Sequence, residues 1–511
     1  MPNHGELPEL AATVLQPGFV GTTAPDWVRR WLGEGLGGVA LFARNVESPA
    51  QIARLTAQLR AERPDIIVAI DEEAGDVTRF ESVYGSSRPG NLALGAIDDP
   101  ELTEAVARDL GADLAAAGIT LDYAPDTDVN SNPHNPVIGV RAFGAEPGLV
   151  ARQSVAWIRG LQAAGVAACA KHFPGHGDTA VDSHHSLPLI DRDRAALEAC
   201  ELLPFRAAIE AGVRAVMTGH LLVPAFDPEL PATLSRRILT DLLRVELGYT
   251  GLIVTDAIEM RGVSGRYGTG GATVRALAAG ADAICVGGEH ADEQTATELR
   301  DAIVAAVLSG DLPEERLRDA AARVRELSAW THQQQTGRPA RIPGAEGSPV
   351  GFDAARRAVR VTVTDRDVAL PIAGPAHVVE FAPPRNIAIG AETPWGVGAP
   401  LDDLLPGTTS VRLTADDLAG VSDPAAPVLA GATGRPLVLV ARDLHRHPWL
   451  ADAIERVLEV RPDAIVVEMG VPVRVLGGVH IATYGATRAC GQAAAELLAG
   501  TSVPAPQPLA A

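Results

Sequence analysis

One short stretch of the chain, residues 170–188, concentrates side chains that could do acid–base chemistry. It reads AKHFPGHGDTAVDSHHSLP and holds four of the thirteen histidines, one lysine and two aspartates. Imidazoles and carboxylates within reach of one another can exchange protons with a substrate near neutral pH. The stretch follows an apolar run, residues 166–170, that is typical of a strand buried on both faces. Titratable groups just past such a strand predict an α/β active site.

Charged residues also follow four other apolar runs. The runs at 66–70, 119–123, 215–217 and 252–255 lead into Asp71-Glu72-Glu73, Asp126 with Asp128, His220, and Asp256 with Glu259, respectively. One such residue alone could be a helix cap, because Asp is a common N-cap. Five buried strands that all end in polar groups favour one rim of a barrel that carries the chemistry.

The elements that would position these groups alternate between strand and helix patterns. Strand-like runs cover 12–20, 38–42, 66–70, 119–123, 166–170, 215–217, 252–255 and 283–286, with helical patterns between them. Alternating β and α units predict a parallel sheet. Eight units over about 310 residues predict a TIM (β/α)8 barrel, with a doubly wound open sheet as the alternative.

The chain changes character after Trp330. Residues 331–351 are polar, rich in Pro and Gly and without periodicity, which is typical of a linker. A second α/β pattern follows over 352–511 and predicts a smaller α/β sandwich domain behind a barrel domain at 1–330. No chemical constellation stands out there, so a structural or dimerising role is the prediction for it.

Composition and charge exclude some classes of binding partner. The net charge is −21 and no Lys/Arg-rich run occurs, which argues against nucleic acid. The first ten residues, MPNHGELPEL, lack the features of a signal peptide, and no apolar stretch is long enough to span a membrane. The four cysteines show no metal or disulfide spacing. We expect a cytoplasmic monomer or homodimer that binds neither membrane nor nucleic acid.

Several segments together resemble a known enzyme family. KHFPGHGDT followed by DSHHSLP closely resembles the signature of bacterial β-N-acetylglucosaminidases of glycoside hydrolase family 3. GGVALFARN (37–45), DEEAGDVTRF (71–80), NPVIGVRAFG (135–144) and VELGYTGLIVTDAIEM (245–260) resemble further family segments in the same order. The resemblance covers about residues 15–330, and two-domain members carry an α/β sandwich after the barrel.

The resemblance implies a retaining mechanism. Asp256 matches the family nucleophile, which forms a glycosyl-aspartate intermediate. The D-S-H segment matches the unusual acid/base pair of this subfamily, with His184 as proton donor and acceptor and Asp182 as its orienting carboxylate. The implied reaction is the removal of terminal β-linked N-acetylglucosamine from cell-wall or chitin-derived saccharides, without metal or cofactor.

Four further positions match residues that bind the sugar hydroxyls and the N-acetyl group in the family, namely Asp71, Arg141, Lys171 and His172. The chain also departs from the family pattern. Ala74 stands where the family usually has glycine, and Asp76 stands where it usually has arginine, which exchanges a cation for an anion.

Alternatives remain at this point. Within the family, the enzyme could be a β-N-acetylglucosaminide phosphorylase with inorganic phosphate as acceptor, since an imidazole does not repel an anion as a carboxylate does. It could also be a broader β-glucosidase. Outside the family, a metal-dependent TIM-barrel hydrolase, a Schiff-base lyase using Lys171 and a non-catalytic binding protein are the rivals.

Overall fold

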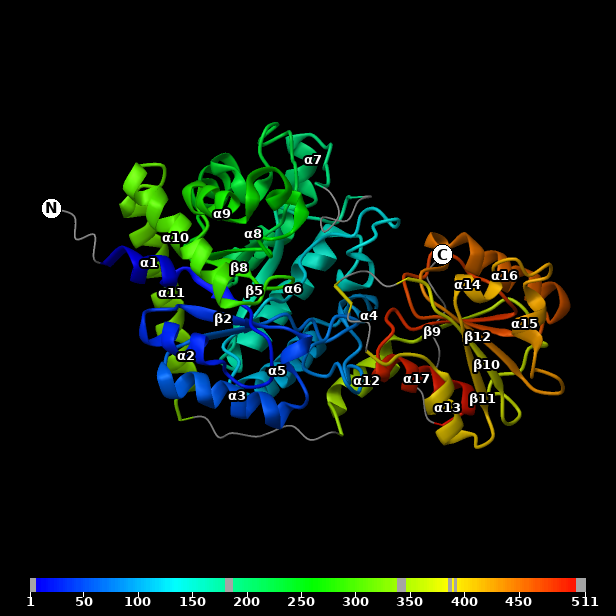
Figure 1. Ribbon diagram of the computed structural model, residues 1–511. Coiled ribbons are helices and arrows are strands. Elements are labelled where there is room, and N and C mark those ends of the chain that lie inside the picture. The colour runs from blue at the N-terminus through cyan, green and yellow to red at the C-terminus, as the bar shows by residue number, and fades with distance from the viewer. Residues whose placement is uncertain (1–5, 180–186, 338–345, 385–387, 390–392, 502–511) are drawn as a thin grey trace. The chain divides into compact units, whose positions relative to one another are not determined.

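The computed structural model describes residues 6–179, 187–337, 346–384, 388–389 and 393–501. The chain forms two compact units, the first of residues 1–73, 100–138 and 142–346, and the second of residues 74–99, 139–141 and 347–511. Each unit has its own sheet (Figure 1). The second unit therefore includes two pieces of chain from well before the predicted linker. The predicted boundaries at 331–351 stay a prediction.

In the described part of the first unit there are eight short buried strands, β1 (Leu15–Pro17), β2 (Gly38–Leu41), β3 (Ile67–Ile70), β4 (Leu121–Asp122), β5 (Ala167–Phe173), β6 (Ala215–Thr218), β7 (Leu252–Thr255) and β8 (Ile284–Val286). Strands β2 to β7 pair in parallel in chain order, and β1 pairs in parallel with β8. A parallel bridge between Val254 and Ala283 links β7 to the start of β8. This is the strand order of a TIM barrel, so the predicted fold class is confirmed.

Helices follow the strands on the outside of this sheet (Figure 1). They are α2 (Asp26–Gly33), α3 (Pro49–Glu62), α5 (Pro100–Ala116), α6 (Pro147–Ala163), α7 (Arg194–Ala199), α8 (Leu202–Glu210), the π-helical η5 (Arg237–Glu246), α9 (Arg261–Ala279), α10 (Glu293–Ser309) and α11 (Glu314–Gln335). Side-chain caps fix where several of them begin. Ser48 accepts the Gln51 N–H at the start of α3, and Asp292 accepts the Thr295 N–H at the start of α10.

The first predicted strand is partly wrong. Residues 12–20 were expected to be extended, but helix α1 runs over Leu7–Thr13 and β1 covers only three residues. The Leu-Ala-Ala run at 10–12 is apolar without a period that separates helix from strand. Pro8 near the start of α1 suits the first turn of a helix, where no backbone N–H is needed.

Alternate strand residues fill the inside of the barrel. The cluster contains Ile67 and Ala69 of β3, Ala167 and Cys169 of β5, and Leu252 and Val254 of β7. Side chains alternate along a strand with a period of two. The next positions in the same phase are Asp71, Lys171 and Asp256, at the carboxyl ends of β3, β5 and β7. Three predicted site residues thus share the phase that faces the barrel interior.

The second unit is a three-layer α/β sandwich, as predicted. Its sheet has the order β11-β10-β12-β13-β14-β9, with only β9 antiparallel among the described strands. The strands are β9 (Arg360–Val363), β10 (His377–Phe381), β11 (Thr409–Leu413), β12 (Leu437–Ala441), β13 (Ile465–Glu468) and β14 (Val479–Ala482). Separate apolar clusters cover its two faces. The helices are α4 (Asn91–Ile97), α12 (Pro349–Ala358), α13 (Gly398–Leu404), α14 (Ala415–Leu418), α15 (Ala425–Leu429), α16 (Pro448–Val460) and α17 (Arg488–Ala499).

All four cysteines carry free thiols, and three of them are buried. Among the helices that the structure describes, none is both long and apolar enough to cross a membrane.

Candidate active site

Lys171, near the carboxyl end of β5, pairs with two carboxylates that follow β3. Its ammonium pairs with Asp71 Oδ1 and lies 2.7 Å from Glu73 Oε1. Asp71 and Glu73 both follow the end of β3 closely, so both acids reach the same cation. The Lys171 side chain is 2% exposed, whereas that of Asp71 is 25% exposed. Asp71 is therefore accessible to a solute, while the buried ammonium of Lys171 balances its negative charge.

Asp122, the last residue of β4, supports the same turn. Its Oδ1 accepts the backbone N–H of Glu72 at 3.0 Å, and Glu72 is the residue between Asp71 and Glu73 in the sequence. Burial, and then the nearby charge of Glu72, raise the pKa of Asp122 well above its usual value. A neutral Asp122 can hold the backbone without adding another negative charge around Lys171.

Asp128 binds both His172 and His176. Its Oδ2 lies 2.8 Å from His172 Nδ1, and its Oδ1 accepts the backbone N–H groups of His172 and His176 at 3.2 and 2.7 Å. Burial raises the pKa of Asp128, but the two histidines and the hydrogen bonds outweigh burial and lower it overall. Asp128 is thus an anionic anchor that orients the His172 ring.

Among the described residues, one group has ligand atoms close enough to hold a metal ion, and it consists of Asp126, Asp128 and His172. Both oxygens of Asp128 already accept hydrogen bonds from His172 or His176. Asp126 Oδ1 likewise accepts the Asp128 N–H at 3.0 Å. These hydrogen bonds are typical of carboxylates that position an imidazole. The absence of a metal from the active site stays a prediction.

Asp256 directly follows β7 and is held by the neighbouring strand. Its N–H donates to Thr218 O of β6 at 3.2 Å, and its Oδ1 accepts the Ala257 N–H at 2.7 Å. His220, which follows β6, places Nε2 3.0 Å from the Ala257 carbonyl. A carbonyl only accepts, so this nitrogen carries a proton. His220 therefore supports the turn that presents Asp256.

Glu259 was singled out beside Asp256, and the structure gives it a structural role. Its Oε1 accepts backbone N–H groups of the loop after β8, from Gly287 at 2.8 Å, Gly288 at 2.5 Å and Glu289 at 3.2 Å. A carboxylate oxygen shared among three donors is a poor nucleophile.

Asp182 and His184, with His185 beside them, lie outside the described residues. The chain on both sides of residues 180–186 is well anchored. Thr179 Oγ1 lies 3.0 Å from His176 Nδ1 before the segment, and Leu222 N donates to Pro188 O at 2.9 Å after it. Arg141, the remaining predicted residue, ends the 3-10 turn η3 (Gly139–Arg141) of the second unit, where its carbonyl accepts from Asn91 Nδ2 at 2.6 Å.

The first two-thirds of the chain match a known family. The model of the glycosyl hydrolase family 3 N-terminal domain covers residues 20–327. The chain belongs to glycosyl hydrolase family 3.

Named relatives are similar to it, and one of them is similar over nearly the whole chain. A solved family 3 β-N-acetylglucosaminidase from a Paenibacillus species has a TM-score of 0.87 at 34% identity over 97% of each chain. Beta-hexosaminidase A of Pseudoalteromonas piscicida is 36% identical over 68% of this chain, and the match spans 62% of that relative's length. A beta-hexosaminidase of Chromobacterium violaceum is 36% identical over 67% of this chain and 92% of the relative.

Two residues of this site were not assigned from the sequence. Glu73 pairs with Lys171, and Asp122 accepts the Glu72 N–H. Glu73 had a usable signal, because it lies in the acidic run Asp71-Glu72-Glu73 that follows the predicted strand at 66–70. Asp122 had none, since it lies inside the predicted strand at 119–123 and not after its end.

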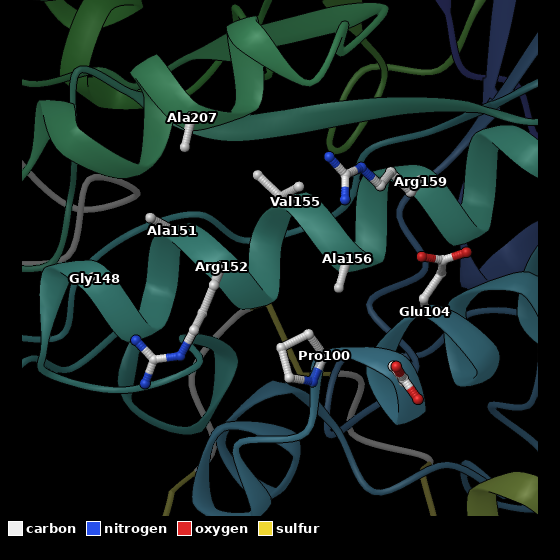
Figure 2. Close-up of a pocket in the computed structure, with 10 residues that line it drawn as sticks. Pro100, Glu104, Gly148, Ala151, Arg152, Val155, Ala156, Arg159 and Ala207 are labelled. Atoms are coloured by element: carbon white, nitrogen blue, oxygen red, sulfur yellow. The ribbon is translucent and has the colours of Figure 1, made fainter.

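A groove of about 470 Å³ lies elsewhere on this unit, among the outer helices α5, α6 and α8. Figure 2 shows Arg152 at one end of it, and Glu104 with Arg159 at the other. It lies on helices and contains none of the strand-end residues, so it is distinct from the candidate active site.

Proposed function

We propose that this family 3 enzyme is a retaining exo-β-N-acetylglucosaminidase that removes terminal β-linked N-acetylglucosamine from cell-wall or chitin-derived saccharides. The observation that carries the proposal is the common inward phase of Asp71, Lys171 and Asp256 at the carboxyl ends of barrel strands. The names of the relatives support the choice of sugar.

Asp256 is the proposed nucleophile. Retention requires a carboxylate that attacks the anomeric carbon and is released by water in a second step. The Ala257 N–H stabilises one Asp256 oxygen in its anionic form. Glu259, the other acid that follows β7, binds the loop at 287–289 instead.

His184 is the proposed acid/base residue, and Asp182 orients it. An imidazole titrates near pH 6.5, so it can protonate the leaving oxygen and then deprotonate the incoming water. This assignment rests on the resemblance of the D-S-H segment, because both residues lie outside the described chain.

Asp71, Lys171, His172 and Arg141 are the proposed sugar-binding residues. Charged groups bind sugar hydroxyls through short, charge-assisted hydrogen bonds. The anchoring of His172 by Asp128 and of Asp71 by Lys171 supports this role, because a bound sugar then meets side chains that are already oriented.

Inorganic phosphate as acceptor is the proposed alternative, supported by the imidazole in place of a carboxylate. A cytoplasmic location and a monomeric or homodimeric state are further proposals from the sequence.

A screen of p-nitrophenyl glycosides, with the product anomers followed by NMR, tests the proposal. We expect the β-N-acetylglucosaminide to be cleaved fastest, with the β-anomer appearing first, and EDTA to have no effect. A first-formed α-anomer would exclude retention. The same spectra with added phosphate, and sulfate as control, report any N-acetylglucosamine 1-phosphate.

A further inference from the structure

The second unit has the topology with which open α/β domains hold ligands. In the sheet order, β11 lies on one side of β10 and β12 on the other, so the chain reverses direction across the sheet between these strands. Ligands of such sheets bind at this switch point, outside the carboxyl ends of the two strands. Arg442 directly follows β12, and its side chain is only 9% exposed. A buried cation at a switch point suggests a site for an anion.

The side chain of Asp76 fills this position. Its Oδ2 lies 2.5 Å from Arg442 Nη2, and its Oδ1 accepts the backbone N–H of Ala486 at 2.7 Å. The Asp76 side chain is 2% exposed. The guanidinium of Arg442 lies 5.0 Å from the centre of the Trp395 ring, a cation–π contact that fixes the cation. One carboxylate thus binds a neutral donor and a charged donor, and an aromatic ring holds the charged donor in place.

Next to this carboxylate, Gly485 lets the chain at Pro89 pack closely against the backbone that precedes Ala486. A Cβ at Gly485 would lie 2.7 Å from the Pro89 carbonyl oxygen and 3.5 Å from Asp76 Oδ1. The first distance is too short for any side chain, so glycine permits the approach. Other bonds fasten the segment that carries Asp76, including Ala489 N to Ser86 O at 3.1 Å.

We propose that Arg442, Trp395 and the Ala486 N–H form a carboxylate-binding cradle at the switch point of the second unit, which Asp76 of the same chain occupies. Its ligand class is a small carboxylate, and the chain supplies that ligand permanently. The cradle goes beyond the proposed glycosidase activity and does not depend on it. It also gives a physical reason for expecting no second active site in this unit.

Removing the internal ligand should make the cradle available to a free one. In the full-length Asp76→Ala enzyme, we expect formate to raise the thermal midpoint saturably, compared with chloride at equal ionic strength, because a ligand that binds only the folded state stabilises it. The wild-type enzyme and Asp76→Ala/Arg442→Gln should show no such rise.

Asp99→Ala is the matched control. Asp99 lies in the same segment and pairs with Arg357 at 2.7 Å, but both of these side chains are about one third exposed. Water can replace that carboxylate, so formate should have no specific effect. An equal rise in Asp99→Ala, or no rise above chloride in Asp76→Ala, would overturn the proposal.

A second comparison applies if Asp76→Ala does not fold. Asp76→Asn keeps the shape of the side chain but leaves Arg442 buried without a counter-charge, which is costly. Asp76→Asn/Arg442→Gln should then be no less stable than Asp76→Asn alone. Losses that simply add would show that the two residues do not act as one site.

Discussion

Lys171 in the barrel and Arg442 in the sandwich are both buried cations at the carboxyl ends of parallel strands, yet their surroundings differ. Lys171 lies between Asp71 and Glu73, and Asp71 is one quarter exposed. Arg442 pairs with Asp76, which is 2% exposed. The same topological position thus holds an open set of polar groups in one unit and a closed pair in the other. Strand-end charge by itself does not identify an active site, because access to solvent distinguishes the two.

The largest expected effect concerns the chemistry that only the open rim should perform. We predict that Asp256→Asn lowers turnover by several orders of magnitude, because an amide cannot form the glycosyl ester. Steady-state hydrolysis of the aryl N-acetylglucosaminide measures this. Glu259→Gln is the control, since a residue bound to three backbone N–H groups should affect stability more than turnover. A larger loss of turnover in Glu259→Gln would contradict the assignment.

A second effect tests whether the imidazole of the D-S-H segment belongs to the open rim. We predict that His184→Ala slows glycosides with poor leaving groups by about 100-fold or more, and activated aryl glycosides much less, since only the former need a proton. The ratio of kcat/KM for the two substrate types is the measurement, and azide should partly restore breakdown of the intermediate. Equal losses for both substrates would argue against His184.

Exchanging each cation for a neutral residue tests the comparison directly. Lys171→Met and Arg442→Gln should each lower the free energy of unfolding by about 3–5 kcal/mol, because each leaves a buried carboxylate without its partner. Only Lys171→Met should also lower kcat/KM by more than about tenfold, since it removes a proposed sugar contact. Urea unfolding and kinetics at a temperature where both variants are folded measure the two effects. Equal losses of kcat/KM would break the comparison.

The smallest effect is a pH dependence from Asp122. Burial raises its pKa in the folded protein, so the folded state keeps a proton that the unfolded state releases at about pH 4. Wild-type stability therefore falls as pH rises from about 4 towards that raised pKa. Asn does not titrate, and it keeps an oxygen for the Glu72 N–H. The stability of Asp122→Asn relative to wild type should rise between about pH 4.5 and 7.5 in urea unfolding, and a constant difference would contradict a protonated Asp122.

Much of the barrel could be predicted from the sequence, because its strands are continuous apolar runs that end in charge. Asp71, Lys171 and Asp256 were found in this way, and their common inward phase follows from the period of two. The ambiguous run at 10–12 and the π-helical pattern of η5 could not be predicted, because their residues fit other local structures equally well.

The inclusion of residues 74–99 in the second unit had no sequence signal, because partners such as Asp76 and Arg442 are far apart in the chain. Only the departures from the family pattern marked the place. Ala74 has φ +55°, a left-handed conformation that explains why the family usually has glycine there. Asp76, which stands where the family usually has arginine, forms the buried pair with Arg442.

The most direct test of the proposed mechanism is to trap the intermediate with a fluorosugar inactivator and to locate the label by peptide mass spectrometry. The proposed mechanism predicts a covalent adduct on Asp256, within the peptide VTDAIEM. A label on Asp71 or Glu259 instead would contradict it.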